Sequence, residues 1–529
     1  MKIQITNNES IDEFCEKHYK KILFIFILLI IISRIYKFGE LPKAIGVDEA
    51  GAAYDAYCLA NYGVDRYLNS FPLYLVNFGG GQSSLYAYLS VIFIKLFGSN
   101  IVSYRLPSLL IFCIGIICSY LLIEEYKDKK TALLFTFLII ICPWHIIYSR
   151  IGLDCNLLSG MFMLDLYLLH KAKKNYQYII AGIMIGLTLY TYALTYIIIP
   201  MFLLVWIIYM LYMRKIKIKQ VILLGIPIFL LALPLMYMIL LNNNIFDRTQ
   251  FGIFTIPKLP EYRENEVNIS NIWKFGLQSL KTTFLTENTI YYIQIPLFIL
   301  GLILETIKTV KEIKKREFSI DSVLTLSFYT ILVANLTVGI WTANKINIIY
   351  IYILYFTTIG ILKIVRESWI ANTLFLSIFI ICFINFEMYY YFDYSQKIHS
   401  GYEDKELYYI TDIIQQDPRT NELEKYIINY NIVEPYIYTI LKNETSPYEF
   451  DKTKVIKEVK NEKIKFKVLS KYKNYNFQIS KSDLKNLDFE KEKYVFVINK
   501  KLKDMIELIE SKNYVKEDYG IYSILKPEI

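Results

Sequence analysis

Four charged residues at the ends of apolar runs have side chains that could act together in group transfer. Asp48 and Glu49 are adjacent, Asp154 lies at the edge of a later apolar run, and Lys345 lies between two others. A carboxylate with its reference pKa of about 4 is ionised at neutral pH and can accept a proton from an attacking hydroxyl. A cation can hold a phosphate and neutralise the charge that grows as its ester bond breaks. This set therefore suits transfer of a group from a phosphate carrier.

Further cations and a histidine stand at similar places. Arg34, Arg105 and Arg150 each lie at the end of an apolar run, and His145 lies close to Arg150. Arg and Lys beside a membrane span commonly extend to lipid headgroups, and His145 could be a packing residue. Asp154 could equally cap a helix by accepting backbone N–H bonds. The residue types alone leave both interpretations open.

The composition predicts a polytopic α-helical membrane protein. The chain has 529 residues, of which 55% are hydrophobic, and it contains many apolar runs that approach the length needed to cross a bilayer. The net charge of +9 comes from Lys and Arg that gather in short loops beside these runs. Such loops set orientation in a membrane, so the positive charge does not indicate nucleic-acid binding.

The charged loops predict about eleven transmembrane helices with a cytoplasmic N-terminus. Clusters such as Lys127–Lys130 and Lys171–Lys174 belong on the cytoplasmic side by the positive-inside rule. Residues 83–97 are then an interfacial helix, and residues 178–213 cross twice with a turn near 190–196. The predicted spans are residues 22–36, 102–123, 131–148, 155–170, 177–191, 195–213, 221–241, 289–308, 322–341, 348–364 and 371–390. The candidate residues lie in or beside the outer loops 37–101, 149–154, 242–288 and 342–347.

Three parts follow from this topology. Residues 1–21 form a cytoplasmic segment, residues 22–390 a transmembrane domain, and residues 391–529 a small extracytoplasmic α/β domain. The last part is predicted to contain strands at 426–430, 494–498, 514–519 and 521–525 and helices at 434–441 and 502–511. We expect a multi-pass protein of the plasma membrane. The abundance of Ile, Lys, Asn and Tyr is compatible with a bacterial source.

The loop 37–101 contains the stretches Gly46-Val47-Asp48-Glu49-Ala50, Gly79-Gly80-Gly81-Gln82, Leu85-Tyr86-Ala87-Tyr88-Leu89 and Leu96-Phe97-Gly98. It is followed by Arg105-Leu106-Pro107-Ser108, Pro143-Trp144-His145, Ser149-Arg150 with Asp154, and Asn344-Lys345-Ile346-Asn347. This order resembles the GT-C membrane glycosyltransferases, in particular the protein O-mannosyltransferase and aminoarabinose transferase group (glycosyltransferase family 39-like). In that group an acidic pair opens the first external loop, two interfacial helices follow, and an Arg-x-Pro-Ser enters the second span. Two departures are Ser83-Ser84, where many relatives carry Pro-Pro, and Lys345, where Arg is common.

The resemblance implies a glycosyltransferase that moves a monosaccharide from a polyprenyl-phosphate donor with inversion. It makes Asp48 the general base, with Glu49 and Asp154 as further catalytic carboxylates. The donor phosphate is expected to contact Arg105, Arg150 and Lys345. The substrate pocket is expected to include His145, Tyr86, Tyr192 and Asn347.

Several alternatives remain open at this point. The chain could be a transporter or lipid flippase of envelope precursors, although such proteins usually place ionisable groups near the bilayer midplane. It could also be a non-catalytic assembly protein. No cofactor is expected, while a divalent cation shared by Asp48 and Asp154 remains an alternative. The expected partners are a polyprenyl-phosphate sugar, a protein, polymer or lipid acceptor of the cell envelope, and membrane lipids. Neither the sugar nor the acceptor follows from the sequence.

Overall fold

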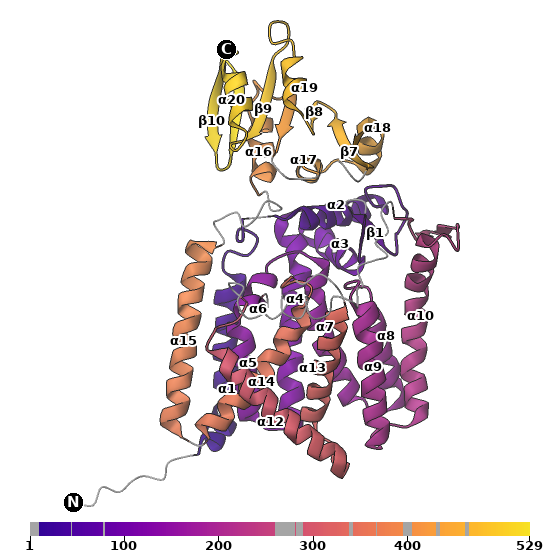
Figure 1. Ribbon diagram of the computed structural model, residues 1–529, viewed down its shortest axis with the longest axis vertical. Coiled ribbons are helices and arrows are strands. Elements are labelled where there is room, and N and C mark those ends of the chain that lie inside the picture. Colours follow the sequence, from indigo (N-terminus) through magenta and orange to yellow (C-terminus); the bar gives the residue numbers. More distant parts are fainter. Residues whose placement is uncertain are drawn as a thin grey trace, which may run out of the picture.

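Long helices form one bundle, and a smaller domain of helices and strands lies over one end of it (Figure 1). We refer to this end of the bundle as the domain-bearing end. The computed structural model describes residues 10–43, 45–77, 80–259, 281, 289–337, 342–366, 368–394, 405–429, 434–460 and 465–528.

The bundle contains fourteen helical segments within the described residues. They are α1 (Ile11–Ile30), the π-helical η1 (Ile31–Ile35), α4 (Ile101–Tyr126), α5 (Lys129–Ile141), α6 (Pro143–Tyr148), the 3-10 helix η2 (Asp154–Asn156), α7 (Leu157–Lys171), α8 (Asn175–Thr188), α9 (Thr195–Tyr212), α10 (Ile218–Asn242), α12 (Gln294–Lys315), α13 (Ile320–Thr337), α14 (Asn347–Val365) and α15 (Trp369–Phe392). The run 178–213 is divided between α8 and α9, which confirms the predicted turn near residues 190–196.

Six of these helices are long and apolar enough to cross a membrane: α4, α9, α10, α13, α14 and α15. The prediction of about eleven spans is therefore wrong by this measure of the described residues. Helices α5, α7 and α8 have 13, 15 and 14 residues. At about 1.5 Å per residue they are shorter than a hydrocarbon core of about 30 Å. The run 131–148 breaks at Cys142 because Pro143 starts a new short helix, α6.

The segment between α1 and α4 lies at the domain-bearing end and holds the acidic pair. It contains α2 (Val47–Tyr62), a hairpin of β1 (Leu75–Asn77) and β2 (Gly80–Gln82), and α3 (Leu85–Phe97). Helix α3 is apolar but only 13 residues long, and it packs against α2 and α4. Its bounds agree with the short helix predicted at residues 83–97. A short antiparallel pair, β3 (Gln250–Phe251) and β4 (Phe254–Thr255), lies beside this segment.

The C-terminal domain is built on a mixed seven-stranded sheet with the order β10-β11-β9-β5-β8-β7-β6. Its elements are α16 (Lys405–Gln416), β5 (Glu424–Ile428), α17 (Tyr436–Lys442), α18 (Pro447–Thr453), β6 (Lys454–Lys460), β7 (Lys465–Tyr472), β8 (Tyr475–Asn476), α19 (Lys481–Lys485), β9 (Tyr494–Asn499), α20 (Lys503–Glu510), β10 (Tyr514–Tyr519) and β11 (Tyr522–Pro527). Strand β5 pairs in parallel with β8 and β9, and the other pairs are antiparallel. The strands and helices predicted for this domain are confirmed to within about two residues.

The C-terminal domain packs directly on α2. Apolar side chains of α2, α16 and α17 share one buried core. The Tyr438 hydroxyl donates to the carbonyl of Ile45 at 2.9 Å, and the Tyr54 hydroxyl donates to the carbonyl of Thr445 at 3.0 Å. The domain therefore helps to hold the helix that carries the acidic pair.

Candidate active site

The acidic pair occupies the first turn of α2, and its two side chains have different surroundings. Gly46 is the N-cap residue, so Asp48 and Glu49 lie where the helix dipole favours negative charge. Consecutive residues on an α-helix project about 100° apart. Asp48 is exposed, whereas Glu49 is buried. The two carboxylates therefore cannot have equivalent roles.

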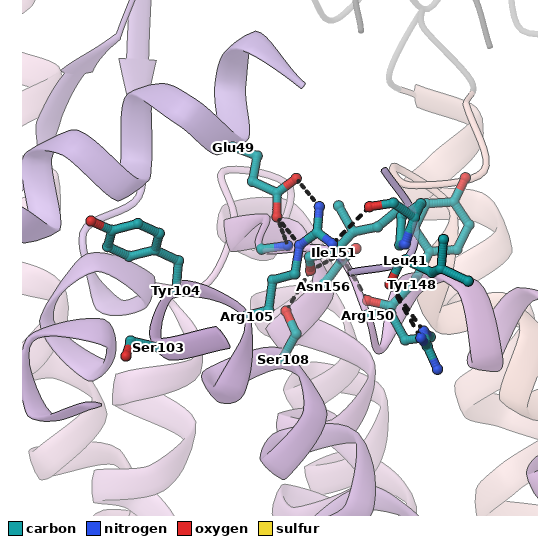
Figure 2. Close-up of polar contacts among 12 residues, drawn as sticks. Leu41, Glu49, Ser103, Tyr104, Arg105, Ser108, Tyr148, Arg150, Ile151 and Asn156 are labelled. Atoms are coloured by element: carbon teal, nitrogen blue, oxygen red, sulfur yellow. Dashed lines mark hydrogen bonds and ion pairs between the residues drawn. The ribbon is translucent and has the colours of Figure 1, made fainter. Parts of the chain in front are cut away.

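Glu49 forms a buried ion pair with Arg105 of α4 (Figure 2). The Arg105 Nε donates to Glu49 Oε1 at 2.7 Å, and Nη2 donates to Oε2 at 3.1 Å. The backbone N–H of Gly152 donates to the same Oε1 at 2.8 Å, and Arg105 Nη1 donates to the carbonyl of Pro42 at 3.0 Å. Both side chains thus tie α2 to its neighbours. In this structure protein groups engage both side chains, and the phosphate contact of Arg105 and the catalytic role of Glu49 stay predictions.

Arg150 is also fully buried, and its guanidinium donates hydrogen bonds to backbone carbonyls. It donates to the carbonyls of Ser33, Tyr36 and Lys37 at 3.2, 2.9 and 3.0 Å and to that of Leu41. These contacts fasten the segment that leaves η1. The guanidinium is not exposed, and the phosphate contact of Arg150 stays a prediction.

Asp154 begins η2 and lies near Asp48. Its Oδ2 accepts from the backbone N–H of Ser83 at 3.2 Å, and its Oδ1 accepts from that of Cys155 at 2.8 Å. Asp48, Asp154 and the half-buried Lys345 are all close enough for their charges to act on the Cys155 thiol. The structure therefore brings together three of the predicted charged residues from three separate loops. The sequence alone could not show this convergence.

Burial raises the pKa of Asp154 to about 7, and the charge of Asp48 adds to the rise, while hydrogen bonds from Cys155, Ser83 and Gln82 oppose it. The folded protein then keeps this proton between about pH 4 and pH 7, where the unfolded chain has lost it. The free energy of unfolding should fall by about 2–3 kcal/mol as the pH rises from about 5 to 7. Asp154→Asn should remove this pH dependence. The melting temperature of the variant should therefore increase relative to that of the wild type as the pH rises.

Thermal unfolding in detergent between pH 5 and pH 8 checks this expectation. Asp247→Asn is the matched control, because Asp247 is an exposed carboxylate on a loop. Parallel melting curves for wild type and Asp154→Asn across this range would show that Asp154 is ionised throughout.

The predicted pocket residues divide into buried and partly exposed groups. Tyr86 is buried and its hydroxyl donates to the carbonyl of Tyr104 at 2.5 Å. His145 is buried against Arg34, with its Nδ1 3.0 Å from Nη2. The place of both residues in a substrate pocket stays a prediction. Asn347 begins α14 and its Nδ2 donates to the carbonyl of Cys155 beside Asp154. Tyr192 is half-buried in the turn between α8 and α9, and its place in a pocket stays a prediction.

The residues that contact Asp48 directly or through Asn77 were not predicted from the sequence. The Asn77 amide donates to Asp48 Oδ1 at 3.1 Å, and a buried Arg66–Asp55 ion pair lies behind it. Asp55 lies among Ala and Tyr residues of α2. A carboxylate among such residues indicates a buried, paired charge, and this signal was present in the sequence. Nothing in the spacing indicated Arg66 or Asn77 as its neighbours.

The fold has known counterparts. The crystal structure of ArnT from Cupriavidus metallidurans in the apo state aligns with a TM-score of 0.59 and 10% identity over 97% of this chain and 98% of that one. The ArnT structure bound to undecaprenyl phosphate aligns with a TM-score of 0.57 and 11% identity over 96% and 97%. At this identity the likeness shows the fold. A comparison with curated proteins finds no match.

The fold of the described residues is therefore that of the two ArnT structures. Residues 82–238 match the family model described as dolichyl-phosphate-mannose-protein mannosyltransferase, which confirms the resemblance seen in the sequence. The matched segment includes Arg105, Arg150 and Asp154, whereas Asp48 and Glu49 precede it.

Proposed function

We propose that this protein is a membrane glycosyltransferase of the GT-C type, which moves a monosaccharide from a polyprenyl-phosphate carrier to a hydroxyl of a cell-envelope acceptor. The observation that carries the proposal is the position of Asp48. It is exposed on the first turn of α2, and Asp154 and Lys345 lie nearby. The matched family and one ArnT structure are described with a polyprenyl phosphate, which supports this class of donor.

In the proposed reaction Asp48 accepts the proton of the acceptor hydroxyl as its oxygen attacks the anomeric carbon. The bond from that carbon to the carrier phosphate breaks, and its electron pair stays on the phosphate oxygen. Attack opposite the leaving group inverts the anomeric configuration. Lys345 neutralises the charge that grows on the phosphate. The leaving phosphate is a weak base, so the reaction needs no separate general acid.

The charge distribution supports an external site. Lys129 and Lys130 pair with Glu16 and Asp12 near the start of α1, at the end of the bundle remote from the C-terminal domain (Figure 1). Lysine-rich short loops favour the cytoplasm, so we place that end inside and the domain-bearing end outside. This arrangement keeps the predicted cytoplasmic segment 1–21 and external domain 391–529.

A metal ion is not part of the proposed reaction. The described residues contain no group of three or more His, Cys, Asp or Glu side chains arranged to hold one. Lys345 can supply positive charge in its place. The alternative of a cation shared by Asp48 and Asp154 predicts that a chelator abolishes turnover.

The donor class is tested by incubating the purified protein with radiolabelled polyprenyl-phosphate sugars, including the mannosyl donor, and a cell-envelope extract as the acceptor. We expect one donor to be consumed and its label to enter the extract. A flippase would move labelled lipid across vesicles without consuming it, and that result would overturn the proposal.

Lys345→Ala is expected to raise the donor concentration needed for half-maximal rate about 10- to 100-fold, because it removes a charge-assisted contact to the phosphate. The rate at saturating donor should change less. Lys258→Ala is the matched control, since Lys258 is an exposed lysine that contacts Asn244 at 2.6 Å. An unchanged donor requirement in Lys345→Ala would remove Lys345 from the phosphate site.

A further inference from the structure

A buried ion pair, Arg66–Asp55, contacts Asn77, which in turn binds the candidate base Asp48. Arg66 and Asp55 are fully buried, and the guanidinium binds the carboxylate at two points. Nε donates to Oδ1 at 3.0 Å and Nη2 donates to Oδ2 at 2.7 Å. The backbone N–H of Arg66 also donates to Asp55 Oδ1 at 3.0 Å. This pair joins the middle of α2 to the loop that follows it.

Arg66 also determines the orientation of the Asn77 amide. Its Nη2 donates to Asn77 Oδ1 at 3.1 Å, and Asn77 Nδ2 donates to Asp48 Oδ1 at 3.1 Å. A guanidinium has only donors and a carboxylate has only acceptors. The reversed amide would place two donors together at Arg66 and two acceptors together at Asp48. The amide is therefore held in one orientation, with its NH₂ group toward Asp48.

The backbone of α2 leaves room for this arrangement at Gly51. A Cβ at this position would lie 2.6 Å from both Arg66 Nη2 and Asn77 Oδ1. Glycine is unfavourable within a helix by about 1 kcal/mol relative to alanine, so its presence here is explained by the close approach. Gly51 thus allows Arg66 and Asn77 to meet one turn away from Asp48.

The hairpin that carries Asn77 also reaches Asp154. Asn77 pairs with Gly80, and Leu75 pairs with Gln82. The next residue, Ser83, donates its backbone N–H to Asp154 at 3.2 Å. One hairpin therefore contacts both carboxylates and can set their separation.

We propose that Asn77 is a positioning residue for Asp48, which rests on the proposed function of Asp48 as the general base. A neutral amide orients the carboxylate toward the acceptor without the strong loss of basicity that a directly paired arginine causes. Glu49 illustrates the opposite case, because Arg105 occupies both of its oxygens. The Arg66–Asp55 pair keeps the amide in the orientation that donates to Asp48.

The test compares Asn77→Ala and Asn77→Asp, using the radiolabelled mannosyl polyprenyl phosphate, or whichever member of the donor panel is consumed, and the cell-envelope extract. Asn77→Ala should lower kcat about 10- to 100-fold with little change in the KM for the donor, because Asp48 loses its orientation. Asn77→Asp keeps an acceptor for Arg66 but puts a negative charge against Asp48. The acidic limb of its pH–rate profile should move up by about one unit or more.

Asn61→Ala is the matched control, since Asn61 lies on α2 and its amide donates within that helix, to the carbonyl of Tyr57 at 3.1 Å. It should keep the wild-type kcat and pH profile. A wild-type kcat in Asn77→Ala, or an unmoved acidic limb in a folded Asn77→Asp, overturns the inference. If Asp48→Asn abolishes turnover while both Asn77 variants behave as wild type, only this inference fails. If Asp48→Asn retains turnover, the proposed role of Asp48 fails first.

Discussion

Asp48→Asn is expected to lower the rate of sugar transfer by about 10²- to 10⁴-fold, the usual contribution of a general base. The amide cannot accept the proton of the acceptor hydroxyl. Asp48 is exposed, and asparagine has nearly the same shape, so the variant should fold. Consumption of labelled donor by the purified variant measures the effect, and its melting temperature checks the fold.

Donor binding should survive this substitution, because the phosphate contact is assigned to Lys345. Asp247→Asn serves again as the control, since it removes an exposed carboxylate from another loop. Turnover by Asp48→Asn within a few-fold of the wild type would exclude Asp48 as the base. Asp154 would then be the next candidate, because it is the other carboxylate near Cys155.

Arg105→Met is expected to cause the largest loss of stability among the substitutions considered. Arg105 and Glu49 are both buried, and removal of one partner leaves an unpaired charge in a low-dielectric environment. Such a loss typically costs about 3–5 kcal/mol. The first turn of α2 would also lose its connection to α4, so sugar transfer should fall with the melting temperature. Thermal unfolding and donor consumption measure the two effects.

The double variant Glu49→Gln with Arg105→Met separates the ion pair from a phosphate role. Without a buried unpaired charge, it should recover part of the stability that Arg105→Met loses. If Arg105→Met melted like the wild type and only the donor KM rose, the phosphate role predicted from the sequence would be supported.

The contacts of the C-terminal domain change how its removal should be interpreted. In the structure Tyr438 donates to the carbonyl of Ile45 just before α2, and Tyr54 of α2 donates to the carbonyl of Thr445. Ala and Tyr side chains of α2 share a buried core with α16 and α17. Deletion would therefore disturb the helix of the acidic pair as well as any acceptor contact.

The sequence by itself determined the membrane class of the protein, the acidic pair and half of the elements of the C-terminal domain. Apolar length and loop charge report on a membrane protein wherever they occur, since the bilayer imposes them locally. A continuous apolar run marked β9 as a buried strand. Hydropathy overestimated the spans because it averages across breaks such as the one at Cys142.

Only the tertiary structure decided what each charged side chain does. Asp48 and Glu49 are adjacent in sequence, but Glu49 is buried in its pair with Arg105 of α4, whereas Asp48 is exposed. Arg150 looked available for phosphate, but its carbonyl partners lie more than one hundred residues earlier in the chain. Burial and hydrogen bonding between distant segments set the surroundings of these side chains. A buried charge needs a partner, and because that partner can come from any part of the chain, the pairing leaves no pattern in the local sequence.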